Sequence, residues 1–535
     1  MIGKRFALLA ASLLVPCAPA YAEANPNDLS AYVRARAADA DGNAAVATTG
    51  YAAALATEPD NAVIALRAYR AAITAGDFAV LTRARLVLER ANLAPADAAL
   101  LALAEAVRDK DAVAIRAAID RVKAGPLDFL APAFRAWAAI GDPVAALAAL
   151  DTAGTNPIER RYGQESRALL LIASGKIDQG ADLVRVLLSA DRASIDLRLA
   201  AAQLLADRGR GDLAMSLLAG SGAELVNARQ SLGNGKPATT AFGISYVLGR
   251  LASDLDDGQS GRLLIVMVRT ALRLDPGNDR ARLVLAYTLA ADGNPAHALK
   301  ALEEIAPASP FRPFADERRV ALLARGEGVA VALAEAARIA AAPAAKPADI
   351  KRYGDLLAEA EQFDAAAAAY RRAIDVDPAA ADWVVYLQLG SALDRAGRWA
   401  KARPMLEKSV ALAPDQPVAL NYLGYGLLEN RGDRATARKL LERASSLRPK
   451  DLSILDSLAW AYFQQGDVAR ALPLLEMAAN GEPANSTINE HLGDAYWQLG
   501  RRYEARYAWR AAALVAEAND APRLAAKIAN GTAAR

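Results

Sequence analysis

The residue types that most often carry out chemistry in proteins are scarce in this chain. Its 535 residues include one cysteine, Cys17, and two histidines, His297 and His491. A catalytic nucleophile or a zinc site needs several such side chains together, and these three lie far apart in the sequence. No G-x-S-x-G, H-E-x-x-H or phosphate-binding glycine loop is present. The sequence therefore predicts a protein that is not an enzyme and that needs no metal ion or cofactor.

A second group of side chains recurs at helical spacing in the last third of the chain. Aromatic rings there lie beside carboxylates and amides, which together give a bound peptide apolar contact and a fixed orientation. The predicted partner-binding residues are Asn421, Tyr425, Asp456, Trp460, Phe463, Glu490, Asp494, Trp497 and Gln498. The acidic members favour a basic or amine-bearing partner. The alternative is that the rings fill the seam between packed helices and that the carboxylates are solvated.

The helices that carry these residues belong to an internal repeat. Prolines close successive units at 378, 414, 449 and 483, which are 36, 35 and 34 residues apart. Each unit has a small residue within its first helix, as at Gly390 and Gly424, and an alanine near the start of its second. Small side chains at these two points allow paired helices to approach closely. A period of this length predicts a solenoid of helical hairpins.

These residues resemble the tetratricopeptide repeat (TPR) family. The stretches YLQLGSALDRAGRWAKARPMLEKSVALAP (386–414) and ILDSLAWAYFQQGDVARALPLLEMAANGEP (454–483) match its pattern of a bulky residue, a Leu-Gly-like pair, a turn, an alanine and a final proline. The resemblance implies an all-α, right-handed superhelical solenoid of TPR and TPR-like hairpins. It also implies a concave groove lined by the first helix of each hairpin.

Three stretches in the C-terminal part of the sequence carry a more specific resemblance. LNYLGYGLLENRGD (420–433), LDSLAWAYFQQGD (455–467) and INEHLGDAYWQLGRRYEARYAW (488–509) are similar to periplasmic repeat proteins of proteobacteria. Some members of that wider group look like lipoprotein adaptors that bring substrates to periplasmic C-terminal processing proteases. The resemblance implies a polypeptide partner, either such a protease or its substrate. Peptide clamps of the family that hold a C-terminal carboxylate use Lys, Arg and Asn, and here only Asn421 matches.

The pattern divides the chain into five segments. We expect a signal peptide over 1–22, a divergent TPR-like array over 23–220 and a linker over 221–240, where glycine and proline are frequent. A regular TPR array follows over 241–515, and a capping helix and tail complete the chain over 516–535. A terminal cap covers the last apolar face of a solenoid.

The first residues have the pattern of a secretory signal. Lys4 and Arg5 precede an apolar run, and Ala20-Tyr21-Ala22 forms a small-x-small cleavage site. The run is too short to cross a bilayer, so we expect export to the periplasm and no transmembrane span. Cys17 follows Leu-Val-Pro, which loosely resembles a bacterial lipidation box; a lipid-anchored protein is the alternative.

Composition and charge narrow the function further. Hydrophobic residues make up 54% of the chain, charged residues 23% and aromatic residues 6%, a balance typical of packed helices. The chain has 63 Lys and Arg against 61 Asp and Glu, so it lacks the positive excess that nucleic-acid binding requires. We therefore predict a protein-binding scaffold or adaptor of the cell envelope. The alternative is an accessory role in polysaccharide assembly or export, with the groove rings stacking on sugars.

Overall fold

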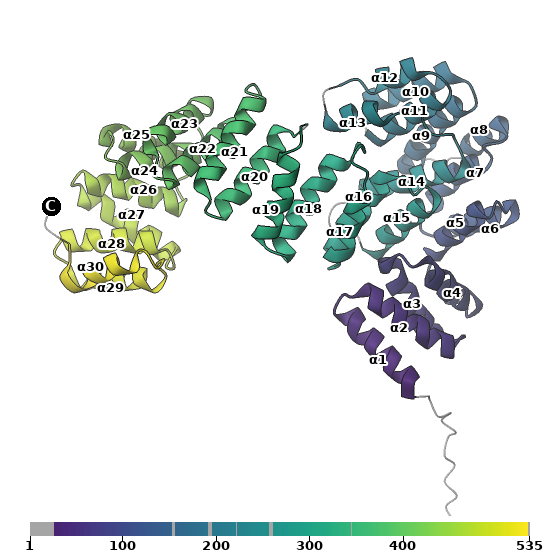
Figure 1. The fold of residues 1–535 in the computed structure, drawn as a ribbon, viewed down its shortest axis with the longest axis horizontal. Helices are drawn as coiled ribbons and strands as arrows, with labels where there is room; N and C mark the ends of the chain where they lie inside the picture. The colour runs from purple at the N-terminus through teal and green to yellow at the C-terminus, as the bar shows by residue number, and fades with distance from the viewer. Residues whose placement is uncertain are drawn as a thin grey trace, which may run out of the picture. The chain divides into compact units, whose positions relative to one another are not determined.

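The computed structural model describes residues 26–151, 156–190, 195–220, 222–255, 261–343 and 345–532. In these ranges the chain forms α-helices and one 3-10 helix, and no strand (Figure 1). This agrees with the predicted all-α class. The chain divides into two compact units after Leu322.

The first unit consists of consecutive helices. They are α1 (Pro26–Ala40), α2 (Ala44–Thr57), α3 (Ala62–Ala75), α4 (Phe78–Arg90), α5 (Ala98–Arg108), α6 (Ala112–Lys123), η1 (Asp128–Leu130), α7 (Ala131–Ala138), α8 (Pro143–Asp151), α9 (Pro157–Ala173), α10 (Ile177–Ala190), α11 (Ile195–Asp207), α12 (Gly211–Leu217), α13 (Ala223–Ser231), α14 (Thr240–Leu255), α15 (Arg262–Leu274), α16 (Asp279–Ala291) and α17 (Pro295–Glu303). The helix α18 (Arg312–Gly326) spans the boundary between the units.

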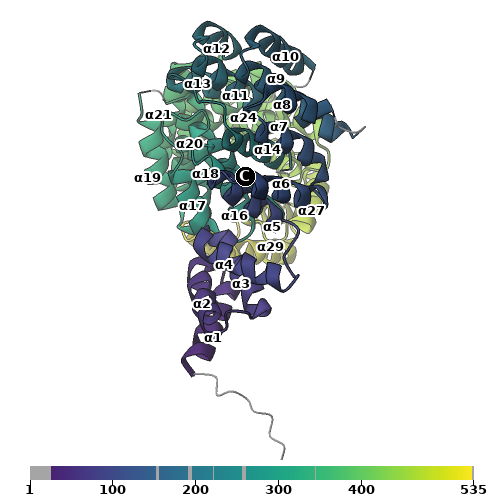
Figure 2. The ribbon, with the colours of Figure 1, turned by 90° about the vertical axis from the view of Figure 1, so that its right-hand side faces the viewer.

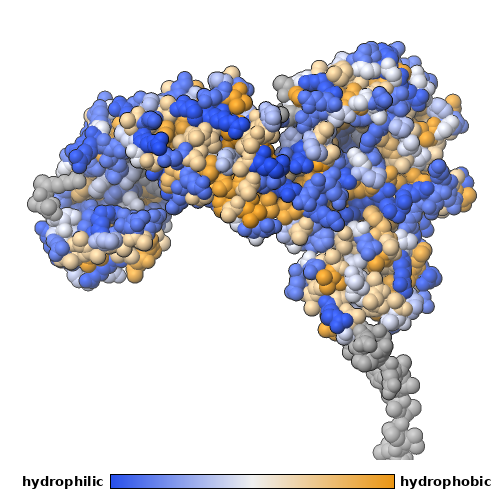
Figure 3. All heavy atoms as spheres, in the orientation of Figure 1, coloured by the Kyte–Doolittle hydropathy of each residue, from blue (hydrophilic) through white to orange (hydrophobic). Residues whose placement is uncertain are grey.

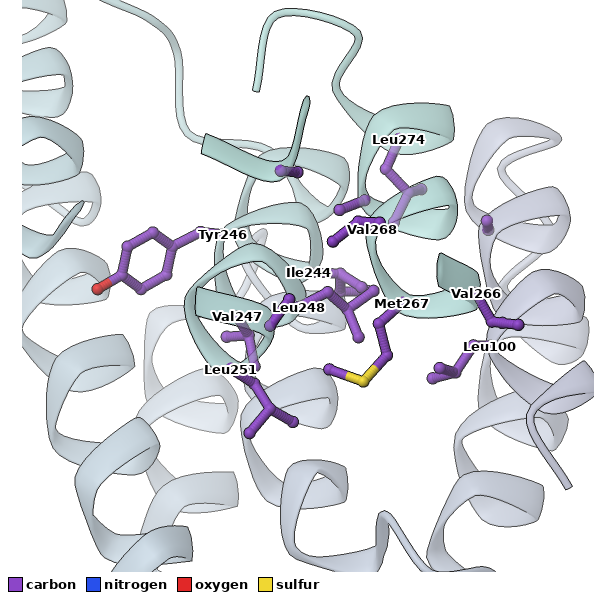
Figure 4. Packing of buried hydrophobic residues seen from close by; sticks show 14 of the residues in the cluster. Leu100, Ile244, Tyr246, Val247, Leu248, Leu251, Val266, Met267, Val268 and Leu274 are labelled. Atoms are coloured by element: carbon purple, nitrogen blue, oxygen red, sulfur yellow. The ribbon is translucent and has the colours of Figure 1, made fainter. Parts of the chain in front are cut away.

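The first unit is more than a simple row of hairpins, because its α14–α15 hairpin packs against helices far earlier in the chain. α14 contacts α5, α7 and α9, and α15 contacts α3 and α5 (Figures 1 and 2). Figure 4 shows the buried side chains at this junction, where Met267 and Val266 of α15 lie near Leu100 of α5. The earlier helices thus bury apolar surface against this hairpin.

Two close contacts fix the α14–α15 hairpin in place. A Cβ added to Gly243 would lie 1.7 Å from the Trp137 ring, so only glycine allows this approach. The Arg269 guanidinium donates hydrogen bonds to the carbonyls of Ile73 (3.1 Å) and Thr74 (2.7 Å) at the end of α3. Burial lowers the pKa of Arg269 to about 10.

The segment 221–240, which the sequence suggests as a linker, is bound into the first unit. It contains α13, and the Asn227 side chain donates a hydrogen bond to the Ser309 carbonyl at 3.2 Å. The Lys236 ammonium lies 3.1 Å from the Asp275 carboxylate. The compact units therefore do not coincide with the expected arrays: α14–α17 fold with the N-terminal helices, and the division comes after Leu322.

The second unit is a regular series of antiparallel hairpins. Its helices are α19 (Val329–Ala340), α20 (Pro347–Glu359), α21 (Phe363–Val376), α22 (Trp383–Arg395), α23 (Trp399–Leu412), α24 (Pro417–Glu429), α25 (Arg434–Leu447), α26 (Leu452–Gln464), α27 (Val468–Gly481), α28 (Ser486–Gln498), α29 (Arg502–Leu514) and α30 (Ala521–Asn530). Each first helix packs on its own second helix and on the helix before it. The surface of this unit carries both hydrophilic and hydrophobic residues (Figure 3).

The small residues predicted inside the first helices permit this close packing. A Cβ added to Gly390 would lie 2.6 Å from the Leu406 side chain, and one added to Gly424 would lie 2.7 Å from Leu441. In the last repeat, a Cβ on Gly493 would lie 2.3 Å from the Trp509 ring. Side chains of the second helix fill the space that each glycine leaves.

The turns between paired helices have a residue in the left-handed region, which is glycine in most of them. Gly397, Gly466 and Gly500 have φ of 72°, 84° and 78°, the left-handed region that glycine adopts without strain. In the repeat between them Arg431 takes this conformation (φ 55°), and Gly432 does not. The requirement for glycine at 432 is steric: a Cβ there would lie 2.8 Å from the Leu427 side chain.

Candidate functional site

The inner face of the second unit is formed by its first helices, α20, α22, α24, α26 and α28. Each of α22, α24 and α26 contacts the next first helix in the series, whereas the second helices do not approach each other as closely. Such a difference curves the stack toward the first helices. We call this surface the inner face, and it is where the predicted partner-binding residues lie.

Two of the predicted rings are buried within the stack. Trp460 and Phe463 are 8% and 7% exposed. The Trp460 ring stacks between Phe463, at 4.9 Å between ring centroids, and His491 of the next repeat, at 3.9 Å. Its indole N–H donates to Glu429 at 2.9 Å. Trp460 and Phe463 therefore join neighbouring repeats and do not form an open wall, which corrects their expected place on the groove surface.

Asn421 and Tyr425 of α24 are half-buried at the edge of this ring stack. The Tyr425 ring centroid lies 6.4 Å from that of His491. Burial raises the pKa of Tyr425, and the nearby charges of Glu429 and Asp456 raise it further. The Asn421 Oδ1 atom is buried without a hydrogen-bond partner. Both residues remain near the inner face.

The predicted acidic residues already have partners within the chain. Asp456 is 5% exposed and lies 2.9 Å from His491 Nδ1. The Lys527 ammonium of α30 lies 2.6 Å from Glu490 and 2.7 Å from Asp494. Arg523 of the same helix also pairs with Glu490. The basic groups that pair with Glu490 and Asp494 therefore come from α30 of the same chain.

The last repeat is covered by α30, which packs on α29 as each first helix packs on the preceding second helix. The Trp497 indole N–H donates to the Thr532 carbonyl at 2.9 Å, and Gly531 lies against the same ring. Gln498 is exposed. Trp497, like Glu490 and Asp494, thus serves the end of the stack. A side chain that faces the groove also faces the next helix of the inner face. Here these side chains contact that neighbouring helix.

An open part of the inner face remains between α20, α22 and α24. A pocket of about 340 Å³ lies there, and its lining includes Asp355, Phe363, Tyr370, Leu387, Gln388, Ser391, Arg395 and Tyr422. Asp355 organises one side of it, because it accepts hydrogen bonds from the Tyr370 hydroxyl at 2.9 Å and the Gln388 amide at 2.7 Å. The Ser391 and Tyr422 hydroxyls are 2.5 Å apart on the other side.

Two groups of this pocket have hydrogen-bonding capacity to spare. The Gln388 Oε1 atom has no hydrogen-bond partner. The Arg395 guanidinium lies 4.2 Å from the centre of the Phe363 ring, and no ion pair joins it to another described residue. The pocket therefore holds one buried acceptor without a donor, on Gln388, and one exposed planar cation, on Arg395.

Two carboxylates on the same face lack a cation among the described residues. Asp394 at the end of α22 accepts a hydrogen bond from Asn430 at 3.4 Å, and Glu429 accepts one from Trp460. Burial raises the pKa of Asp394, and the charge of Glu429 raises it further. Sequence reasoning missed Asp355, Gln388, Asp394 and Arg395. They lie on the first helices upstream of those considered. Extending the same register would have found Asp355, Asp394 and Arg395, whereas Gln388 lies one residue after the register position that Leu387 occupies.

Two features are absent from the described residues. In the part that the structure describes, no three His, Cys, Asp or Glu side chains gather as they would around a metal ion. Over the same residues, no helix is long and apolar enough to cross a membrane. Cys17, the candidate lipidation site, and the rest of the predicted signal peptide lie outside the described residues.

Comparison with known proteins identifies the repeat. The model of the Tetratricopeptide repeat family matches residues 267–313 and, in overlapping matches, 353–417, 387–451, 427–486 and 457–522. The repeats in these matched residues are tetratricopeptide repeats. The matches cover the whole inner face from α22 to α28 and most of α20. The TPR segment 267–313 lies within the first unit.

Similar proteins share the repeat over limited lengths. A TPR repeat-containing protein of Pseudomonas aeruginosa is 41% identical over 56 residues, which is 10% of each chain. The crystal structure of MamA is 25% identical, covering 30% of this chain and 91% of that one, with a TM-score of 0.26. A thermophilic TPR protein of Thermus thermophilus is 20% identical, covering 35% and 98%, with a TM-score of 0.30.

Proposed function

We propose that this protein is a non-enzymatic scaffold or adaptor that binds a polypeptide on the inner face of its second unit. TPR arrays serve as protein-binding scaffolds, and this unit is such an array. The observation that carries the proposal is the pocket between α20, α22 and α24, where Gln388 and Arg395 keep unused hydrogen-bonding groups beside apolar side chains.

The pocket suits an extended peptide. Peptide bonds present alternating N–H donors and carbonyl acceptors, so the exposed Arg395 guanidinium can donate to a carbonyl. The Gln388 oxygen is buried, so it can accept only from an N–H that enters the pocket. Leu387, Phe363 and Tyr370 offer apolar surface for a side chain between these points. Asp394 and Glu429, further along the face, favour a basic residue in the part of the peptide that lies over α24.

We place this function in the cell envelope. The support is the sequence of residues 1–22, which has the pattern of an export signal, and the resemblance to periplasmic TPR proteins of proteobacteria. The partner that this resemblance favours is a periplasmic protease or its substrate. N-terminal sequencing of the protein from fractionated cells tests the location: cleavage after Ala22 supports it, and an intact N-terminus in the cytoplasm contradicts it.

A role in binding sugars receives less support from the structure. Stacking on a sugar needs an open ring face, and Trp460 and Phe463 are both buried against neighbouring rings. Trp497 is covered on one side by Gly531. We therefore do not propose polysaccharide as the ligand of this face.

The test uses the full chain and a display library of random peptides as the probe. We expect enrichment of peptides, and an enriched peptide should bind at least about tenfold more weakly to Arg395→Ala and to Gln388→Ala. Lys439→Ala, an exposed change on the second helix α25, is the matched control and should leave affinity unchanged. A peptide whose affinity is the same for all three variants, or no enrichment at all, would contradict the proposal.

A further inference from the structure

The last second helix, α29, has an outer face unlike those of the earlier repeats. Tyr503, Tyr507 and Leu514 are 80%, 69% and 87% exposed, and Arg510 between them is also exposed. Their spacing of four, three and four residues puts all four on one side of the helix. We call these four residues the outer stripe.

The equivalent positions of the preceding repeats carry small or polar residues. Aligning the repeats on Ala437, Ala471 and Ala505 puts the outer stripe opposite two sets of residues, which are Ala469, Pro473, Glu476 and Asn480 on α27, and Ala435, Lys439, Glu442 and Ser446 on α25. Repeat packing therefore does not require two tyrosines and a leucine at these positions. Exposed tyrosine and arginine are the residues enriched where proteins bind one another.

Other residues of α29 are buried or contact neighbouring helices, and these contacts hold the helix and its outer stripe in place. Its opposite side is buried, with Trp509 and Ala512 both at 0% exposure. Of the arginines on its flank, Arg502 lies 3.8 Å from the centre of the Trp497 ring, and Arg506 donates to the Ile528 carbonyl at 2.9 Å. Arg510 forms no ion pair or hydrogen bond with the other described residues. Its guanidinium is free for a partner.

The outer stripe is complementary to itself. Tyr503 and Leu514 lie equally far from its midpoint, and so do Tyr507 and Arg510. When two copies of α29 pack antiparallel, Tyr503 of one chain therefore faces Leu514 of the other, and Tyr507 faces Arg510. The first pair buries apolar surface, and the second puts a guanidinium on an aromatic ring. A two-fold axis forms each contact twice.

We infer that two copies of this chain pair through the outer stripe, with their α29 helices antiparallel. The contact leaves the pocket of each chain uncovered, because the outer stripe lies on α29 and the pocket is lined by α20, α21, α22 and α24. One helix on each side buries less surface than a standard interface, so the dimer should form in the micromolar range. Each assembly would then present two peptide-binding faces.

The test is analytical ultracentrifugation of the full chain carrying Cys17→Ser, up to about 100 μM, a range set by the expected micromolar affinity. We expect a monomer–dimer equilibrium that Leu514→Asp and Arg510→Glu each weaken at least about tenfold. Leu447→Asp, at a leucine that is 42% exposed at the end of α25, is the matched control and should leave the equilibrium unchanged. Circular dichroism confirms that each variant stays helical.

Cysteine cross-linking tests the antiparallel register. In the same Cys17→Ser background, a mixture of Tyr507→Cys and Arg510→Cys chains should form a disulfide-linked pair faster than either variant alone. Three outcomes would overturn the inference: a monomer over the whole concentration range, a dimer that Leu514→Asp does not weaken, or cross-linking that is no faster in the mixture.

Discussion

Trp460 and His491 stack face to face across the junction of two repeats, with ring centroids 3.9 Å apart and an angle of 13° between their planes. Asp456, one turn before Trp460, lies 2.9 Å from the same histidine. The residues of α26 that would have formed a groove wall are therefore bound to α28. This junction is a structural element, and the peptide-binding surface that we propose lies further toward α20.

Removing the Trp460 ring should destabilise the protein. Replacing a buried tryptophan with alanine leaves a cavity, so we expect Trp460→Ala to lower the free energy of unfolding by about 3–5 kcal/mol. Trp460→Phe keeps a ring between Phe463 and His491 and should cost less. Urea denaturation followed by circular dichroism measures both changes. An unchanged midpoint for Trp460→Ala would show that the ring does not support the junction.

Close packing at Gly493 should make it intolerant of a side chain. A Cβ there meets Trp509 at 2.3 Å, so Gly493→Ala should cost about 1–3 kcal/mol through overpacking. Gly163 in α9 is the control, because a Cβ there meets nothing within 4 Å. Gly163→Ala should be neutral or stabilise by about 0.5–1 kcal/mol through helix propensity. Thermal unfolding should separate the two variants, and equal effects would refute the steric explanation.

The ion pairs of α30 should differ in strength according to their burial. Lys527 has 17% of its side chain exposed and serves both Glu490 and Asp494, so Lys527→Met should destabilise by about 2 kcal/mol. The Arg523 side chain is 51% exposed, and Arg523→Met should cost less than about 1 kcal/mol. Denaturant titration of both variants checks this order. The reverse order would mean that Lys527 does not anchor the terminal helix.

Asp394 should make stability depend on pH. Burial raises its pKa in the folded state, so the folded protein holds this proton more tightly than the unfolded chain does. Its contribution to stability is thus present below the unfolded pKa and is lost as pH rises through the folded pKa. As pH rises above the ordinary pKa of aspartate, about 3.9, the free energy of unfolding of the wild type should therefore fall relative to that of Asp394→Asn. Parallel profiles for the two proteins would contradict this, and Asp375→Asn, an exposed change on α21, controls for net charge.

The repeats could be predicted because their signals are local. Gly390, Gly424 and Gly493 mark the points where paired helices touch, and the helix boundaries follow from turns such as those at Gly397 and Gly500. These constraints act within about 35 residues of sequence, the length of one repeat. Periodicity alone therefore gives the hairpin and its stacking.

The candidate site was harder to predict because exposure depends on neighbouring repeats. Trp460 and Tyr425 occupy the same register, yet Trp460 is enclosed by Phe463 and His491, which come from two different helices. The packing of α14 and α15 on α3, α5, α7 and α9 is a similar case, since helix periodicity does not state which distant helices meet. The repeat pattern therefore does not predict contacts between residues that are far apart in the sequence.

Site-specific photo-crosslinking in cells tests the central claim most directly. A photoreactive phenylalanine analogue at Leu387, in the pocket between α20, α22 and α24, should crosslink to a polypeptide in the cell envelope. The same analogue at Lys439, on the exposed side of α25, should give little or none of that product. Mass spectrometry of the Leu387 product should place the crosslinked residue in one segment of the partner. Crosslinks at Lys439 but not at Leu387 would contradict binding on the inner face.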